Sequence, residues 1–99
     1  MHKTPGQREA VACLHWLEGE IRAVRPQAIV ALGAVAARSL LGSGVSVMRE
    51  RGQWRRRDDG IPVLLTVHPS ALLRGDREQF EAAFDTWVAD LRRATSPPE

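Results

Sequence analysis

Residues 28–42 have the sequence AIVALGAVAARSLLG and carry the clearest structural signal in this chain. The apolar run Ala28–Leu32 is short, unbroken and rich in branched side chains, as expected of a β-strand that is covered on both faces. Gly33 ends this strand, and Ala34–Leu41 has the composition of a compact helix that Gly42 closes. The segment therefore predicts a buried strand followed directly by a helix, which is a building unit of α/β proteins.

Comparable signals lie on both sides of this segment. Ile61–Val67 is a second apolar run and predicts a second buried strand. At the amino end, Thr4, Pro5 and Gln7 have the order of a helix cap, a first-turn proline and the far end of a capping box. The apolar residues that follow at helical spacing are Ala10, Leu14, Leu17, Ile21 and Val24. They predict a first helix, which Pro26 would stop.

Asp76 is predicted to cap a last helix. The apolar stripe of that helix, which we expect to face a core, consists of Phe80, Ala83, Phe84, Trp87, Val88 and Leu91. Between the two apolar runs, Val45–Glu50 and Gln53–Arg56 are separated by Gly52 and are expected to form a small hairpin or loose edge strands. The order helix–strand–helix–strand–helix predicts an α/β protein with a parallel sheet. Two parallel strands are too few to cover three helices, so the pattern indicates half of a domain.

The composition limits the classes of protein that remain. The chain has 99 residues, which is one small domain at most, and 43% hydrophobic with 26% charged residues argues against a disordered chain. A single cysteine, Cys13, excludes an internal disulfide and any metal site built from this chain's thiols alone. The run Ala28–Ala37 is too short to cross a membrane, and the polar start Met1–Glu9 does not resemble a secretory signal, so we expect a cytoplasmic protein. Thirteen of the fourteen basic residues are arginine, which fits a nucleic-acid partner or, alternatively, a GC-rich genome.

The clearest candidate for chemistry is the tripeptide His68-Pro69-Ser70. It follows the second predicted strand directly, and ligands of open α/β sheets bind beyond the carboxyl ends of the strands. Ser70 offers a hydroxyl and an amide at the start of a turn, which suits a phosphate. The alternative is a histidine that only caps the strand.

Three motifs resemble a known family. The run His68-Pro69-Ser70-Ala71-Leu72-Leu73-Arg74 is similar to the His-Pro-Ser-x-x-Leu-Arg motif of uracil-DNA glycosylases, particularly the iron–sulfur family 4 and its UdgX-type relatives. Ala31-Leu32-Gly33, followed by Ala36 and Leu40-Leu41-Gly42, resembles the strand and helix that precede this motif. The opening His2-Lys3-Thr4-Pro5, then Glu9 and Cys13, is similar to the UdgX signature, in which a histidine loop leads into a helix with a cluster cysteine.

The resemblance implies roles for the residues around His68. His68 would donate a hydrogen bond to the uracil oxygen as the base departs. Pro69 and Ser70 would pinch the DNA backbone, either Leu72 or Leu73 would fill the gap left by the flipped base, and Arg74 would contact a phosphate or a groove. For the two leucines the alternative is packing in the core.

Further implied roles fall near the amino end. In UdgX-type enzymes the histidine that matches His2 attacks the sugar carbon and traps the DNA covalently, and Lys3 in the same loop is assigned to DNA binding. Only Met1 precedes His2, whereas the family has a longer basic loop there. Cys13 matches the last of four cysteines that hold a [4Fe–4S] cluster in the full-length family, and this chain alone is not expected to hold that cluster. The family's Gly-Glu-x-Pro-Gly loop is also absent from the chain.

The resemblance thus implies an α/β three-layer sandwich with a central parallel sheet, present here as its carboxyl-terminal half. We expect residues 1–95 to form this partial uracil-DNA glycosylase domain and residues 96–99 to form a polar tail. The expected function is hydrolysis or covalent trapping at the uracil–deoxyribose bond of DNA, single-stranded DNA foremost, in base-excision repair. The alternatives are a DNA-binding remnant without catalysis and a truncated reading frame that does not fold stably.

Overall fold

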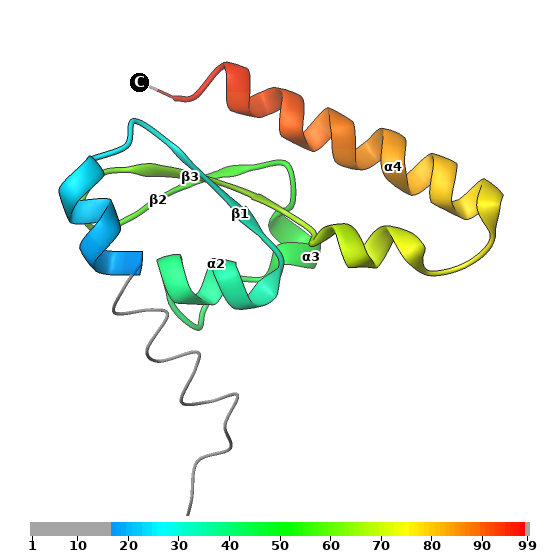
Figure 1. Ribbon diagram of the computed structural model, residues 1–99, viewed down its shortest axis with the longest axis horizontal. Helices are drawn as coiled ribbons and strands as arrows, with labels where there is room; N and C mark the ends of the chain where they lie inside the picture. Colours follow the sequence, from blue (N-terminus) through cyan, green and yellow to red (C-terminus); the bar gives the residue numbers. More distant parts are fainter. Residues whose placement is uncertain (1–16, 99) are drawn as a thin grey trace, which may run out of the picture.

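The computed structural model describes residues 17–98 and shows a small sheet with helices on both sides (Figure 1). Residues 17–24 are helical, which agrees with the predicted end of the first helix before Pro26. The elements that follow are β1 (Ile29–Leu32), α2 (Ala34–Leu41), α3 (Val47–Glu50), β2 (Trp54–Arg56), β3 (Pro62–Thr66), the 3₁₀ helix η1 (Pro69–Leu73), α4 (Arg77–Arg92) and the 3₁₀ helix η2 (Arg93–Thr95). None of the helices in this described range is long and apolar enough to cross a membrane.

The sheet has the strand order β1-β3-β2. β1 and β3 are parallel, with Ile29 opposite Val63 and Leu32 opposite Thr66, which confirms the predicted parallel pair. β2 lies antiparallel on the other edge of β3, so an antiparallel edge strand is added to the predicted parallel pair and the sheet is mixed. A short connection from Arg56 to Pro62 explains the direction of β2, because adjacent antiparallel strands need only a tight turn whereas parallel strands need a long crossover.

Two alternatives were predicted for Val45–Glu50 and Gln53–Arg56, a small hairpin or loose edge strands. The hairpin is not formed, whereas β2 within Gln53–Arg56 is an edge strand. Val47–Glu50 is instead a single helical turn, in which the Ser46 amide donates to a Glu50 carboxylate oxygen at 2.8 Å and the Glu50 amide donates to the Ser46 carbonyl at 2.9 Å. The bond from the Ser46 amide is the main cause that lowers the pKa of Glu50. These local bonds override the strand preference of the β-branched residues, and β2 pairs with β3 instead.

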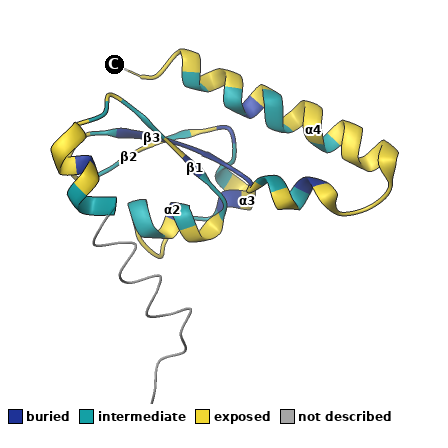
Figure 2. Ribbon diagram, in the orientation of Figure 1, coloured by how far each residue is buried: buried dark blue, intermediate teal, exposed yellow. Residues whose placement is uncertain are grey.

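The core is centred on β3, the central strand of the sheet, whose ribbon Figure 2 colours by burial. All five residues of β3 are buried, as expected of a central strand. The largest cluster of buried side chains combines residues from β1, α2, α3 and the β3 segment, namely Ala31, Ala37, Val47, Val63, Leu65 and Val67. Side chains alternate along a strand, so Leu64 and Thr66 project to the opposite face, where Thr66 contacts α4. Figure 1 shows the corresponding layers, with α2 on one side of the sheet and α4 on the other.

Asp76 caps helix α4, as predicted, and the helix begins at Arg77. The Asp76 side chain accepts from the Gln79 amide at 2.8 Å, and the Gln79 side chain accepts from the Asp76 amide at 2.9 Å, which completes a capping box. The apolar stripe is only partly covered, contrary to expectation. Phe80 and Phe84 stack with ring centroids 6.0 Å apart but remain exposed, because this half of α4 extends past the sheet (Figure 1).

Candidate active site

The candidate site lies where β1 and β3 end side by side. Gly33 follows β1 and His68 lies two residues beyond β3, and the Gly33 amide donates to the Thr66 carbonyl at 2.9 Å. A Cβ atom on Gly33 would lie 3.1 Å from the His68 Cβ, and Gly33 has a φ of +92°. Both the left-handed backbone and this close approach require glycine. The glycine therefore allows His68 to lie directly against the end of the neighbouring strand.

The imidazole of His68 is exposed and oriented through one ring nitrogen. Its Nδ1 accepts a hydrogen bond from the Ser70 amide at 3.1 Å and lies 2.9 Å from the Ser70 hydroxyl. An atom that accepts from an N–H group carries no proton, so the neutral ring has its proton on Nε2. In this tautomer Nε2 is the ring nitrogen that can donate a hydrogen bond.

The turn after His68 separates the two candidate leucines. Pro69–Leu73 forms η1, in which residues three apart lie on the same side because a 3₁₀ helix has three residues per turn. Leu72 is 5% exposed and belongs to the interior, whereas Leu73 is 76% exposed. Ser70 shares the exposed side with Leu73, while Pro69 is half-buried and Arg74 is exposed. The structure therefore leaves His68, Ser70, Leu73 and Arg74 exposed at this strand end and buries Leu72 as a packing residue.

Two residues of α4 contact the strand that ends at this site, and our sequence analysis assigned neither a polar role. The Trp87 indole donates to the Val67 carbonyl at 3.1 Å, and an Asp90 carboxylate oxygen accepts from the Thr66 hydroxyl at 2.7 Å. A signal was present, since Thr66 is the only polar residue in the run Ile61–Val67 and a buried hydroxyl needs a partner.

The family model described as "Uracil DNA glycosylase superfamily" matches residues 1–92. The chain belongs to the uracil-DNA glycosylase superfamily.

Two relatives in this superfamily are called type-4 uracil-DNA glycosylase. The protein from Thermotoga maritima is 40% identical over 96 residues, which are 96% of this chain and 48% of the relative. The protein from Pyrobaculum aerophilum is 32% identical over 84 residues, which are 74% of this chain and 41% of the relative. The chain thus spans about half the length of the relatives it matches.

Three residues singled out by the resemblance to this superfamily, His2, Lys3 and Cys13, lie outside the described residues. Within residues 17–98, no group of three or more His, Cys, Asp or Glu side chains is placed to hold a metal ion. The chain has one cysteine, whereas a [4Fe–4S] cluster is normally held by four thiolates. The residues present therefore do not fit an iron–sulfur cluster.

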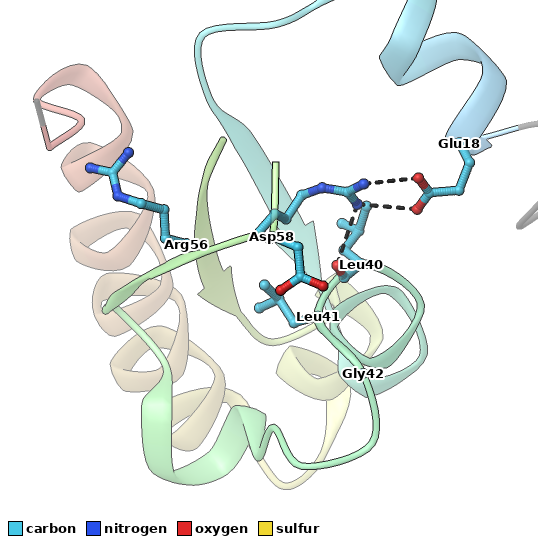
Figure 3. Close-up of a pocket in the computed structure, with 7 residues that line it drawn as sticks. Glu18, Leu40, Leu41, Gly42, Arg56 and Asp58 are labelled. Carbon is cyan, nitrogen blue, oxygen red and sulfur yellow. Dashed lines mark hydrogen bonds and ion pairs between the residues drawn. The ribbon is translucent and has the colours of Figure 1, made fainter. Parts of the chain in front are cut away.

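Five arginines lie close together in the chain, and three of them form internal ion pairs; the five are Arg49, Arg51, Arg55, Arg56 and Arg57. The Arg57 side chain is 10% exposed, and its guanidinium bonds Glu18 at 2.8 Å and Asp59 at 3.2 Å (Figure 3). The bond to Glu18 is the main cause that raises the pKa of Arg57. Arg55 pairs with Glu50, and Arg51 pairs with Asp90 at 3.0 Å. These pairs identify a structural role for Arg51, Arg55 and Arg57.

The hollow beside Arg57 has a volume of about 340 Å³, and its lining residues are Glu18, Leu40, Leu41, Gly42, Arg56, Arg57 and Asp58 (Figure 3). None of these residues belongs to the surface around His68. The hollow is therefore separate from the candidate active site.

Proposed function

We propose that this chain supplies the carboxyl-terminal part of a uracil-DNA glycosylase active centre, which acts on uracil in DNA during base-excision repair. The observation that supports this proposal is the exposed His68 imidazole at the strand end, with its Nδ1 engaged by Ser70. Membership of the superfamily supports the same reaction class. Single-stranded uracil DNA is the proposed substrate.

The proposed reaction requires a hydrogen-bond donor to the uracil oxygen, and this donor does not need to carry a positive charge. When the bond between uracil and deoxyribose breaks, its electron pair goes to the base and positive character develops on the sugar carbon. A donor at the uracil oxygen stabilises the departing base, and removal of one such donor typically lowers a rate by about 10²–10³-fold. The Nε2–H of His68 would provide this bond without placing a second positive charge beside the sugar.

The exposed residues near His68 would hold the DNA. Leu73 is the leucine that can enter the gap left by a flipped base, because Leu72 is buried. The Ser70 hydroxyl and the Arg74 guanidinium are exposed and suit phosphate oxygens, and Pro69 fixes the backbone between His68 and Ser70. Lys3 is proposed as a further phosphate contact.

The test of the glycosylase proposal uses the full chain and a single-stranded oligonucleotide with one uracil. Strand cleavage after alkali treatment measures loss of the base. We expect His68→Ala to lower the initial rate by about 10²–10³-fold and His15→Ala, a matched histidine control, to leave it unchanged. A His68→Ala variant as active as the parent would exclude the proposed donor.

We further propose that His2 traps the DNA. The imidazole lone pair of His2 would form a bond to the sugar carbon once the bond to uracil has broken, and the ring would then lose its proton. The product is a covalent protein–DNA adduct, which is detected as a separate band on a denaturing gel. The band should be lost in His2→Ala and retained in His15→Ala, and alkali-labile product without a band would exclude trapping.

A DNA-binding role without catalysis is the second candidate, because Ser70, Leu73 and Arg74 are all exposed in the turn that follows His68. It predicts that fluorescence anisotropy detects binding of a labelled single strand although no base is released. Arg74→Ala should weaken that binding and flatten its salt dependence, while Arg77→Ala, a matched exposed arginine on α4, should do so less. Equal effects of the two variants would exclude a specific contact by Arg74.

A further inference from the structure

Helix α4 forms hydrogen bonds to two consecutive residues at the carboxyl end of β3, Thr66 and Val67. The Trp87 Nε1 donates to the carbonyl of Val67 at 3.1 Å, and the Asp90 carboxylate accepts from the hydroxyl of Thr66 at 2.7 Å. Trp87 and Asp90 are three residues apart, so they lie on the same face of α4. His68 follows Val67 directly, which places both bonds immediately before the candidate donor.

The Asp90 contact joins a third segment to this arrangement. Asp90 is buried, and its carboxylate also accepts from the Arg51 Nε at 3.0 Å. A Cβ on Gly52 would lie 2.7 Å from the Asp90 Oδ1, so the turn that precedes β2 can approach Asp90 only because it has glycine there. A buried carboxylate is costly unless it is paired and hydrogen-bonded, and both conditions are met here. Asp90 therefore joins α4, β3 and the turn at residues 51–52 in one fixed geometry.

The backbone around His68 is thus constrained from two directions. Gly33 lies against the His68 Cβ on the β1 side, and the Trp87 indole holds the preceding carbonyl on the α4 side. Ser70 then orients the ring itself through Nδ1. A catalytic group that is displaced by about 1 Å can lose about 10²-fold in rate, so constraints on the backbone matter for the reaction.

We propose that Trp87, with the Asp90–Thr66 pair, is a positioning residue: it fixes the backbone that carries His68, so that Ser70 can hold the imidazole in one orientation. The consequence for catalysis rests on the proposed glycosylase function, whereas the orientation of the ring does not. Trp87 has no part in the chemistry; it acts on His68 through the Val67 carbonyl.

The first test compares Trp87→Phe with Trp54→Phe in the full chain. Trp87→Phe keeps an aromatic ring but removes the N–H donor, and Trp54 is a half-buried tryptophan of β2 that serves as the matched control. The measurement is the pair of His68 ring ¹⁵N shifts at neutral pH, assigned with His68→Ala. We expect one Nε2–H tautomer in the parent and in Trp54→Phe, and a shift toward mixed tautomers in Trp87→Phe. Unchanged His68 shifts in Trp87→Phe would overturn the proposal, whether or not the chain cleaves DNA.

A second pair of variants keeps the proposal testable if Trp87→Phe does not fold. Thr66→Val removes the hydroxyl that bonds Asp90, and Thr66→Ser retains it. The His68 ring shifts should change in Thr66→Val and return to the parent values in Thr66→Ser. Identical shifts in the two variants would overturn the role of the Asp90–Thr66 pair.

Activity separates this proposal from the glycosylase proposal. If the parent releases uracil, Trp87→Phe should lower kcat by about 10-fold with little change in KM, because ground-state contacts to DNA are retained. An inactive parent with the expected ¹⁵N changes would refute the glycosylase proposal alone. An active Trp87→Phe variant with parental kcat would refute the positioning role alone.

Discussion

Thr66→Val is the perturbation with the clearest expected cost in this protein. Thr66 is 0% exposed, and its hydroxyl donates at 2.7 Å to the buried Asp90 carboxylate. Valine has nearly the same shape, so the substitution creates no cavity and isolates the loss of this bond. Hydrogen bonds to charged groups contribute about 1.5–3 kcal/mol, and the Asp90 carboxylate would be left with the Arg51 Nε as its remaining partner within the described residues. We therefore expect the free energy of unfolding to fall by about 2 kcal/mol.

Urea unfolding followed by tryptophan fluorescence measures this loss. With an m value of about 1–1.5 kcal/mol/M, the midpoint should fall by about 1–2 M without a change in m. Thr86→Val is the matched control, since Thr86 lies exposed on α4 and its hydroxyl bonds the Ala82 carbonyl of the same helix. Its cost should stay within about 0.5 kcal/mol. A Thr66→Val midpoint equal to that of Thr86→Val would refute the buried bond, and a parent chain without a cooperative transition would refute the packing described here.

Three further predictions concern stability. Leu72→Ala should cost about 2–5 kcal/mol in urea unfolding and Leu73→Ala less than about 0.5 kcal/mol, and similar costs would contradict their opposite burial. Gly33→Ala should lower the free energy of unfolding more than Gly60→Ala. Both glycines have a positive φ, but only at Gly33 would an added Cβ meet a neighbour, the His68 Cβ at 3.1 Å. The reverse order of urea midpoints would exclude the close approach at the strand end. The pKa of Glu50 in the folded protein is lowered from its ordinary value of 4.5. The ionised Glu50 carboxylate therefore stabilises the fold above pH 4.5, and this stabilisation is lost as the pH falls through the lowered pKa of the folded state. The urea midpoint of Glu50→Gln should consequently fall less than that of the parent between about pH 5 and about pH 3, and parallel pH profiles would refute the assignment.

Local sequence signals predicted the elements whose stability depends on near neighbours. Helix Ala34–Leu41 and the Asp76 cap were predicted at the residues where they occur, because a closing glycine and a capping box act within a few residues. The parallel pairing of β1 with β3 was also predictable, since both are fully apolar runs with a helix between them. The position of His68 at the strand end followed from the same pattern.

Contacts between distant segments settled the remaining features. Leu72 and Leu73 are adjacent and identical residues, yet Leu72 is buried and Leu73 is exposed. Which of the two is buried depends on how η1 packs against its neighbours. The bond between Asp90 and Thr66 joins residues 24 positions apart, and no local pattern specifies such a partner. A hydrophobic period records which residues prefer to leave water, whereas a buried carboxylate is tolerated only when folding brings its donors to it. For that reason the layers and the place of His68 at the strand end could be anticipated from the chain, but the network that holds this strand end emerged only in three dimensions.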